Sequence, residues 1–271
     1  MDRRLTPATL RVAHVSLRGI IDAPRYTAGT PLRVMRPLAD LLQRPHGPRD
    51  RQLLLGDAFT VIDQSEGHSF GFATKDGYCG WLPDAALGDM PAPTHWIASP
   101  GTHLYPEPRV QAPEIASLSL GARVPVTNLT ATWAETPLGF LPTPHLRAIG
   151  DWAADPVGVA ESLLGTPYLW GGNSRAGLDC SGLVQLATHA CGHTCPGDSD
   201  LQQSLGHPVS GPACQRGDLL FWRGHVAWVS DPDTILHANG HTMSVAYEPI
   251  TAALTRIAAQ NGGPVTHHRR P

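Results

Sequence analysis

The stretch Gly165-Thr-Pro-Tyr-Leu-Trp-Gly-Gly172, followed by Asp179-Cys180-Ser-Gly182, carries most of the information in this chain. Two spaced histidines, His225 and His237, lie downstream, each beside a run of apolar residues. A cysteine at the start of a helix, followed by two such histidines, is typical of a thiol nucleophile with a base and a group that orients the base. The pattern therefore favours a hydrolase.

The residues around Cys180 predict how the thiol is placed. Asp179 is a favoured N-cap residue, so Cys180 falls at the first position of a helix. The unpaired N–H groups and the dipole at a helix start favour negative charge, which predicts a lowered pKa for this thiol. The small residues Ser181 and Gly182 are expected to leave the sulfur open. The alternative is a buried cysteine that acts only as a small apolar side chain.

The two histidines are expected to meet on one face of a hairpin. Alternate residues of a strand share a face, so His225 lies on the same side as Ala227. If Ser230 pairs with Thr234 across a turn, Ala227 opposes His237, and the two histidines become diagonal neighbours. One imidazole then orients the other, which counts against a purely structural role for Cys180 and for either histidine.

The C-terminal part of the chain predicts a small α+β domain with helices packed on an antiparallel sheet. Apolar residues recur at helical spacing in two segments, and Gly192 is a good C-terminal cap for the second. Runs of β-branched and aromatic residues follow. The expected helices cover 156–164 and 180–191, and the expected strands cover 218–222, 225–230 and 234–238.

The N-terminal half reads as short strands between turns. The Asp76-Gly77 step is a hairpin signal between apolar runs. The segment 120–126 resembles 55–61, and Gly-Phe-Leu-Pro at 139–142 resembles Gly-Trp-Leu-Pro at 80–83. An internal repeat of this kind predicts two related β-barrels, and the motifs resemble those of bacterial SH3-like domains. The alternative is that these barrels serve only as spacers or tethers.

The Pro and Gly punctuation near 91–93 and 150–151 predicts the domain boundaries. The expected domains are an SH3-like barrel over 1–90, a second SH3-like barrel over 91–150 and a catalytic domain over 151–271. The abundance of Gly, 28 residues, and Pro, 26 residues, agrees with turn-rich domains rather than a helical bundle.

Charge and cysteine content set limits on partners and location. A formal net charge of -3 provides no basic field for nucleic acid or an anionic membrane. No apolar run is long enough to span a bilayer, and the segment 1–7 has no apolar run behind its basic residues. We therefore expect a cytoplasmic protein with reduced thiols. The Cys191-Gly-His193-Thr-Cys195 cluster lacks a second cluster of the kind that zinc sites pair, so we expect neither a metal nor another cofactor.

Residues 151 to about 250 resemble the NlpC-type, papain-like bacterial cell-wall peptidases. The resemblance rests on the stretches quoted above together with Gly217-Asp-Leu-Leu-Phe-Trp222, His225-Val-Ala and Leu236-His-Ala. It implies that Cys180 is the nucleophile, that His225 is the base and that His237 orients the base. It also implies that Tyr168 lies beside the nucleophile and assists at the oxyanion or in substrate contact.

Two SH3-like domains ahead of such a domain narrow the resemblance to the γ-D-glutamyl-L-diamino-acid endopeptidases of the dipeptidyl-peptidase VI type. Those enzymes recycle murein peptides by cutting between γ-D-Glu and the diamino acid in fragments with a free L-Ala, and their first SH3-like domain closes one end of the groove. The resemblance implies murein peptide as the partner. It implies substrate-binding roles for Tyr78, Trp170, Asp179, Ser181, Asp198 and Ser199.

The residues themselves support part of this substrate site. An ammonium group in a groove needs acceptors, because burying it unpaired is costly. Asp198-Ser-Asp200 is the densest acceptor cluster after the helix of Cys180. The alternatives are a solvated capping turn at Asp198, a simple helix cap at Asp179 and a barrel-core side chain at Tyr78.

Two rival functions stay open. An amidase or acyltransferase could use the same Cys-His pair on another acyl group. A binding module without catalysis could hold cell-wall peptides, although a binder has no need of all three of Cys180, His225 and His237.

Overall fold

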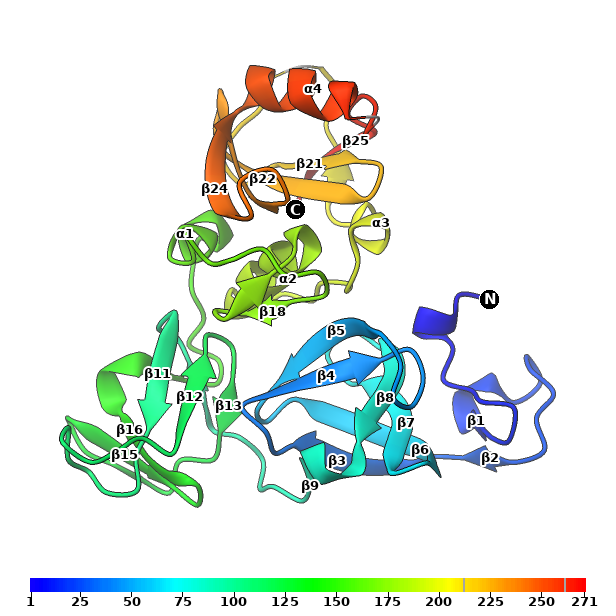
Figure 1. The fold of residues 1–271 in the computed structure, drawn as a ribbon, viewed down its shortest axis with the longest axis vertical. Helices are drawn as coiled ribbons and strands as arrows, with labels where there is room; N and C mark the ends of the chain where they lie inside the picture. The colour runs from blue at the N-terminus through cyan, green and yellow to red at the C-terminus, as the bar shows by residue number, and fades with distance from the viewer. Residues whose placement is uncertain (212, 261) are drawn as a thin grey trace. The chain divides into compact units, whose positions relative to one another are not determined.

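The computed structural model describes residues 1–211, 213–260 and 262–271, and Figure 1 gives the course of the chain. The chain divides into two compact units, Met1–Ile149 and Gly150–Pro271. The division falls next to the expected boundary near 150–151. The expected boundary between 90 and 91 stays a prediction. Among the described residues, no helix is both long enough and apolar enough to cross a membrane.

The first part of unit 1 is a seven-stranded sheet in the order β5-β4-β8-β7-β6-β3-β9. Neighbouring strands in it pair antiparallel. The strands are β3 (Thr30–Val34), β4 (Leu38–Leu42), β5 (Arg49–Leu54), β6 (Ala58–Ser65), β7 (His68–Ala73), β8 (Cys79–Pro83) and β9 (Leu87–Gly88), with the 3-10 helix η3 (Asp84–Ala86) between the last two.

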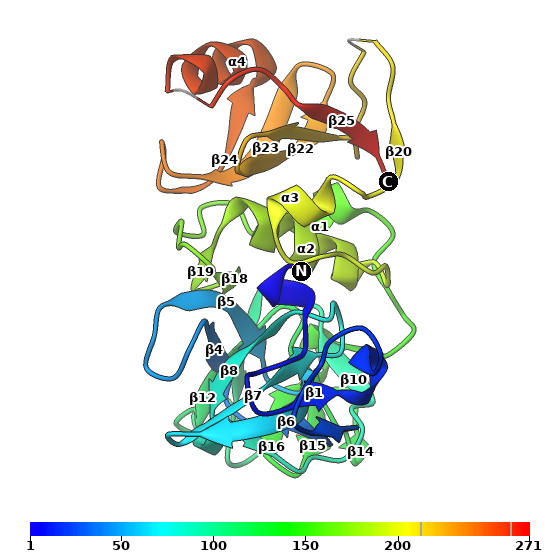
Figure 2. The same cartoon turned by 90° about the vertical axis from the view of Figure 1, so that its right-hand side faces the viewer.

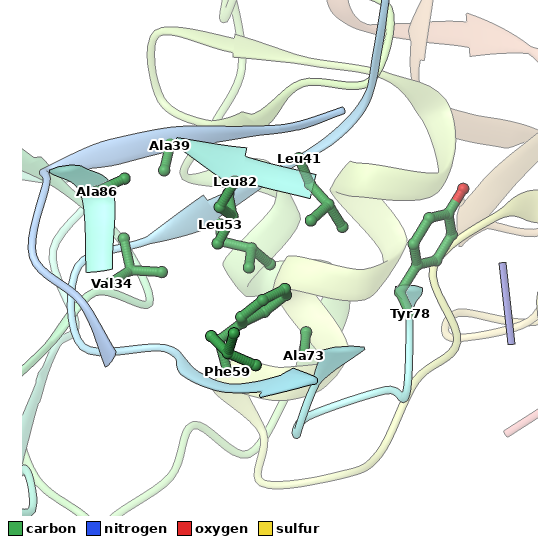
Figure 3. Close-up of a cluster of buried hydrophobic side chains, with 10 residues drawn as sticks. Val34, Ala39, Leu41, Leu53, Phe59, Ala73, Tyr78, Leu82 and Ala86 are labelled. Carbon is green, nitrogen blue, oxygen red and sulfur yellow. The ribbon is translucent and has the colours of Figure 1, made fainter. Parts of the chain in front are cut away.

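One apolar cluster fills this sheet's interior, and Figure 3 shows its side chains. Phe59 and Leu82 lie at its centre with almost no exposure. Burying each large apolar side chain contributes about 1.5–3 kcal/mol, so this cluster is the main support of the sheet. Tyr78 belongs to the same cluster, and its hydroxyl points away from the other labelled side chains (Figure 3).

The residues before the sheet pack against it through ion pairs. The Arg11 side chain donates to Asp63 at 3.0 Å and 3.1 Å, and Arg3 donates to Asp50 at 2.6 Å. This segment contains the short elements η1 (Arg3–Leu5), β1 (Ala13–His14), η2 (Val15–Leu17) and β2 (Tyr26–Thr27).

The second part of unit 1 contains three small sheets, β13-β10-β17, β11-β12 and β14-β15-β16. Leu120 and Leu141 are among the buried side chains of this part. The strands are β10 (His95–Ile97), β11 (Gly101–Leu104), β12 (Ala116–Ser119), β13 (Arg123–Val124), β14 (Asn128–Leu129), β15 (Trp133–Thr136), β16 (Gly139–Pro142) and β17 (Leu146–Ala148), with η4 (Thr143–His145) before the last.

Unit 2 is built on a six-stranded antiparallel sheet in the order β20-β25-β21-β22-β23-β24. Its strands are β20 (His207–Pro208), β21 (Leu219–Trp222), β22 (His225–Asp231), β23 (Thr234–Asn239), β24 (Ser244–Pro249) and β25 (His267–Arg270). The other elements are α1 (Pro156–Glu161), β18 (Asn173–Ser174), β19 (Gly177–Leu178), α2 (Cys180–Ala190), α3 (Ser199–Gln202) and α4 (Ile250–Ala259).

Helices cover both faces of the unit 2 sheet, as Figures 1 and 2 show. Helix α4 lies on one side, where Ala253 and Ile257 pack against Ala227, Val229 and Ile235. Helices α1 and α2 lie on the other side and contact β22 and β23. The expected α+β arrangement of helices on an antiparallel sheet is therefore confirmed for this unit.

Two expected details of unit 2 were wrong. The first helix ends at Glu161 rather than at residue 164, because a turn follows in which Ser162 closes the helix. Ser230 does not pair with Thr234, because β22 contains a bulge and Asp231 takes that place. Beyond the bulge the expected register holds, with Trp228 opposite Leu236.

Candidate active site

Cys180 is the first residue of α2, and Asp179 is its N-cap. The Asp179 carboxylate accepts from the Gly182 N–H at 2.6 Å and from the Ser181 hydroxyl at 2.9 Å. Its second oxygen accepts from the Gly171 N–H at 2.9 Å. Asp179 therefore fixes both the helix start and the loop that carries Tyr168.

Glycine is required where this loop meets the helix. A Cβ atom on Gly182 would collide with the carbonyl oxygen of Gly172, and one on Gly172 would collide with the backbone of Gly177. The close backbone approach explains the glycines at 172 and 182 in physical terms. It holds Cys180 against the 168–172 loop.

His225 and His237 form the central pair of the site. The Nε2 atom of His225 lies 2.8 Å from Nδ1 of His237, and the rings meet edge to face with centroids 5.1 Å apart. The diagonal placement expected from the hairpin register is thus confirmed. His237 is 1% exposed, so little water competes for this hydrogen bond.

The surroundings of Cys180 correct two expectations. The residue is 7% exposed, so the small neighbours do not leave the sulfur open. Burial, followed by the Asp179 carboxylate, raises the pKa of Cys180 to about 12 rather than lowering it. The backbone N–H groups of Val226, Ser181 and Cys180 itself act in the opposite sense and lower the pKa of the thiol. Desolvation outweighs the helix start here.

Burial also controls the two imidazoles. It lowers the pKa of His225 to about 3 and the pKa of His237 to about 4, although Glu248 acts to raise both values. Near neutral pH the resting site therefore holds a neutral thiol and two neutral imidazoles. A neutral imidazole keeps one unprotonated ring nitrogen, which is the atom that can accept a proton.

Tyr168 lies within the electrostatic range of the nucleophile. Burial raises the pKa of Tyr168, and the charges of Cys180 and Asp179 raise it further. The phenol stays protonated at neutral pH and remains a hydrogen-bond donor. The expected neighbourhood of Tyr168 and Cys180 is confirmed, whereas its catalytic role stays a prediction.

The predicted substrate residues of unit 2 surround the start of α2. Trp170 is 72% exposed, whereas the Ser181 hydroxyl is engaged by Asp179. Asp198 occupies the N-cap position of α3 but makes no side-chain capping bond, and Ser199 is buried. Gln202 ties α3 to α2 by donating to the Ser181 carbonyl at 2.9 Å. Their binding roles stay predictions.

Tyr78 lies in unit 1, in the apolar cluster of the seven-stranded sheet, and is 2% exposed. The guanidinium of Arg51 stacks over its ring at 5.7 Å from the centroid. These contacts give Tyr78 a packing role in its own unit. A role in substrate binding stays a prediction.

Sequence reasoning missed two residues of this site, Glu248 and Arg256. Glu248 Oε2 lies 3.1 Å from Nε2 of His237. Arg256 of α4 donates to both Glu248 oxygens, at 2.9 Å and 2.7 Å. His237 pairs with Ala246, so Glu248 is its diagonal neighbour, and the register rule applied to β22 and β23 could have found it in β24.

A cavity of about 310 Å³ opens beside His225. Arg223, His241 and Arg256 contribute to its lining. The cavity brings cationic and hydrogen-bonding groups next to the base. It can accommodate a small polar or charged group.

The cysteine cluster at 191–195 forms no metal centre in the described part of the chain. No group of three or more His, Cys, Asp or Glu side chains in that part is arranged to hold a metal ion. Cys191 ends α2, and the Cys195 sulfur contacts Gln202 at 3.5 Å. All five cysteines are free thiols.

Two family models match this chain. Residues 165–257 match the NlpC/P60 family, and residues 41–87 match the bacterial dipeptidyl-peptidase Sh3 domain. The first match contains Cys180, His225, His237 and Glu248. The second covers most of the seven-stranded sheet and establishes an SH3-like region in unit 1.

Individual relatives agree with these matches. A γ-D-glutamyl-L-lysine dipeptidyl-peptidase of Bacillus cereus is 27% identical over 241 residues, 74% of this chain and 70% of the relative. Dipeptidyl-peptidase 6 of Lysinibacillus sphaericus is 26% identical over 238 residues, 76% and 86% of the two chains. The crystal structure of an NlpC/P60 family protein from Bacillus cereus has a TM-score of 0.76 at 21% identity, covering 89% of this chain and 99% of that one, and so shares its fold. This chain carries a cysteine-peptidase domain of the NlpC/P60 family at residues 165–257 and, ahead of it, a bacterial dipeptidyl-peptidase Sh3 domain at residues 41–87.

Proposed function

We propose that this protein hydrolyses the bond between γ-D-Glu and a diamino acid in murein peptides with a free N-terminal L-Ala, and so acts in cell-wall peptide recycling. The observation that carries the proposal is the hydrogen-bonded pair of His225 and His237 on strands next to Cys180. The names of the two dipeptidyl-peptidase relatives support the substrate class.

In the acylation step, Cys180 attacks the γ-glutamyl carbonyl carbon. Because the resting thiol is neutral, the sulfur must lose its proton to His225 as it attacks. The Cys180 N–H and the Tyr168 hydroxyl are the donors proposed for the oxyanion. His225 then delivers the proton to the diamino acid nitrogen, the C–N bond breaks, and a thioester remains on Cys180.

In the deacylation step, His225 takes a proton from water as the water oxygen attacks the thioester carbonyl. The C–S bond breaks, and the sulfur recovers the proton as L-Ala-γ-D-Glu leaves. His237 holds the His225 ring through the 2.8 Å contact during both steps. No cofactor takes part in this scheme.

Two groups of side chains are proposed to bind the peptide. Asp198 and Ser199, next to the start of α2, provide acceptors for the free ammonium of L-Ala, and Trp170 offers an exposed ring to the peptide chain. The cavity beside His225 is proposed to take the diamino acid. Its cationic Arg223 suits a carboxylate of that residue.

We further propose that 91–150 is a second, smaller SH3-like barrel. Matching contacts in the two copies support this. In the first copy the Gly56 N–H donates to the Val34 carbonyl, and in the second the Gly121 N–H donates to the Ile97 carbonyl, both at 2.9 Å. The strand that closes each copy then pairs with the same partner position, Leu87 with Val34 and Leu146 with Ile97.

The proposed function is tested by mass spectrometry of L-Ala-γ-D-Glu-meso-diaminopimelate after incubation with the full chain. A peptide with an acetylated amino terminus and the Cys180→Ala variant serve as controls. We expect release of L-Ala-γ-D-Glu from the free peptide alone, and none with the variant.

Other results would revise the proposal in defined ways. Equal cleavage of the acetylated peptide would retain the peptidase and remove the free-amine requirement. Absence of cleavage with tight binding would favour the binding module. Transfer of the acyl group to an added amine in preference to water would favour an acyltransferase.

A further inference from the structure

We infer that Glu248, held by Arg256, is a positioning residue that fixes the proton arrangement of the His237–His225 pair. The inference rests on the proposed role of His225 as the base. It extends the site from three groups to a chain of five across α2, β22, β23, β24 and α4. Its members are Cys180, His225, His237, Glu248 and Arg256.

The hydrogen bond between the two rings allows only two proton arrangements in their neutral forms. Either His225 carries its proton on Nε2 and donates to Nδ1 of His237, or His237 carries its proton on Nδ1 and donates to Nε2 of His225. In the first arrangement Nδ1 of His225 is unprotonated and can accept the thiol proton. In the second it carries the proton and cannot act as a base.

Glu248 selects the first arrangement. If Nδ1 of His237 is an acceptor, its proton sits on Nε2 and faces Glu248 Oε2 at 3.1 Å. If Nδ1 carries the proton, the lone pair of Nε2 faces the lone pairs of a carboxylate, which is repulsive. A carboxylate that fixes a histidine tautomer through the outer ring nitrogen is an established device at catalytic and metal sites.

The carboxylate is itself held in place. Arg256 donates from Nε to Oε1 and from Nη2 to Oε2 of Glu248, so the guanidinium grips both oxygens. This hydrogen bonding lowers the pKa of Glu248. A fixed, ionised carboxylate is the form that accepts a proton from an imidazole N–H.

The contact between Glu248 and His237 is close but not fully aligned. The separation of 3.1 Å is that of a hydrogen bond. Nε2 of His237 is nevertheless buried, and no described residue lies at the angle that a hydrogen bond to this atom requires. A small tilt of the ring on substrate binding would align it, as is common for catalytic hydrogen bonds in unliganded enzymes. Among the residues that the structure describes, Glu248 provides an acceptor oxygen at ion-pair distance from this nitrogen.

A purely structural ion pair between β24 and α4 is the competing explanation, and the chain offers a matched control. Arg216 donates to both oxygens of Glu161, at 2.9 Å and 2.8 Å, in the same unit. Tyr247 interacts with Glu161, and successive residues of a strand face opposite sides, so Glu161 lies on the other side of β24 from Glu248. Glu161→Met removes a similar pair away from the histidines.

The test combines two readouts on the full chain. The first is the tautomer of His237, read from histidine ring ¹⁵N resonances and assigned with a His237→Gln variant. The second is kcat and KM for the murein tripeptide in wild type, Glu248→Met, Glu248→Gln and Glu161→Met, with thermal unfolding as the folding check.

We expect His237 to carry its proton on Nε2 in wild type and to lose that preference in Glu248→Met. We expect kcat of Glu248→Met to fall about 10- to 100-fold, the range for outer hydrogen-bond partners, with KM little changed. Glu248→Gln, which keeps an acceptor oxygen, should retain the tautomer and more of kcat. Glu161→Met should match the wild-type kcat.

Three results would overturn the inference. The first is a wild-type His237 that carries its proton on Nδ1. The second is a Glu248→Met enzyme with the wild-type kcat. The third is a loss of kcat in Glu248→Met that is matched by an equal loss in Glu248→Gln or in Glu161→Met. If wild type cleaves no murein peptide, the proposed function fails, and the ¹⁵N spectra alone still decide the role of Glu248.

Discussion

Nε2 of His225 and Nδ1 of His237 are 2.8 Å apart, and this contact joins β22 to β23, the two strands that helix α2 of Cys180 contacts. Burial keeps the pKa of each ring well below its ordinary value. The resting site therefore holds a neutral thiol and two neutral imidazoles, and in the proposed mechanism the reaction begins with a proton transfer rather than with a preformed thiolate.

The reactivity of Cys180 should reflect this neutral resting state. Because the pKa of the thiol is raised to about 12, its thiolate fraction should keep rising with pH across the working range. We expect the logarithm of the alkylation rate with iodoacetamide to increase by about one per pH unit between about pH 6 and 9. Mass mapping of Cys180 against the partly buried thiol of Cys214 gives the rate. A plateau starting below pH 6 would instead indicate a thiolate–imidazolium pair.

Asp179 raises the pKa of Cys180 and also caps α2, and two variants separate these effects. Asp179→Asn keeps an acceptor for the helix start but removes the negative charge, so the pKa of Cys180 should fall and alkylation at pH 7.5 should accelerate. Asp179→Ala loses the cap as well, which should cost about 1–2 kcal/mol of stability. Denaturant unfolding measures the second effect. Equal stability of the two variants would show that the side-chain cap of Asp179 does not contribute to the free energy of unfolding.

Acid should destabilise the folded protein through the histidine pair. The pKa values of His225 and His237 are about 3 and 4 when folded, below the ordinary value near 6.5. The unfolded chain therefore binds more protons between about pH 6.5 and 4, and stability must fall as the pH falls through that window. The slope is about 1.4 kcal/mol per pH unit for each proton.

The matched comparison is wild type against His225→Gln, unfolded in denaturant at several pH values with tryptophan fluorescence as the signal. The variant should lose less stability between pH 6.5 and 4.5 than wild type, because one buried titrating ring has been removed. Parallel curves for the two proteins would mean that His225 titrates alike in the folded and unfolded chain, so that its pKa is not lowered by folding.

The sequence patterns predicted the parts of the site that depend on local geometry. Asp179 caps α2 because an aspartate before a helical run can accept from the N–H three residues ahead. His225 and His237 meet because strand alternation and hairpin pairing set diagonal neighbours. The bulge at Ser230 did not disturb this result, since it lies on the turn side of both histidines.

Other features depend on contacts that no local pattern contains. The pKa of Cys180 is governed by burial against β22, where the Val226 N–H reaches the sulfur. Glu248 lies near His237 because β24 pairs with β23, and Arg256 reaches Glu248 because α4 packs on the sheet. Gln202 likewise ties α3 to α2 through a carbonyl that sequence spacing does not indicate.

Covalent capture tests the central claim, that Cys180 is the nucleophile and His225 its base, most directly. The measurement is the intact mass of the full chain, quenched in acid during turnover of the murein tripeptide, with peptide mapping of any adduct. We predict an L-Ala-γ-D-Glu thioester on Cys180 in wild type, and much slower formation of it in His225→Gln. Release of L-Ala-γ-D-Glu without an adduct on Cys180, or at an unchanged rate in Cys180→Ala, would contradict the account.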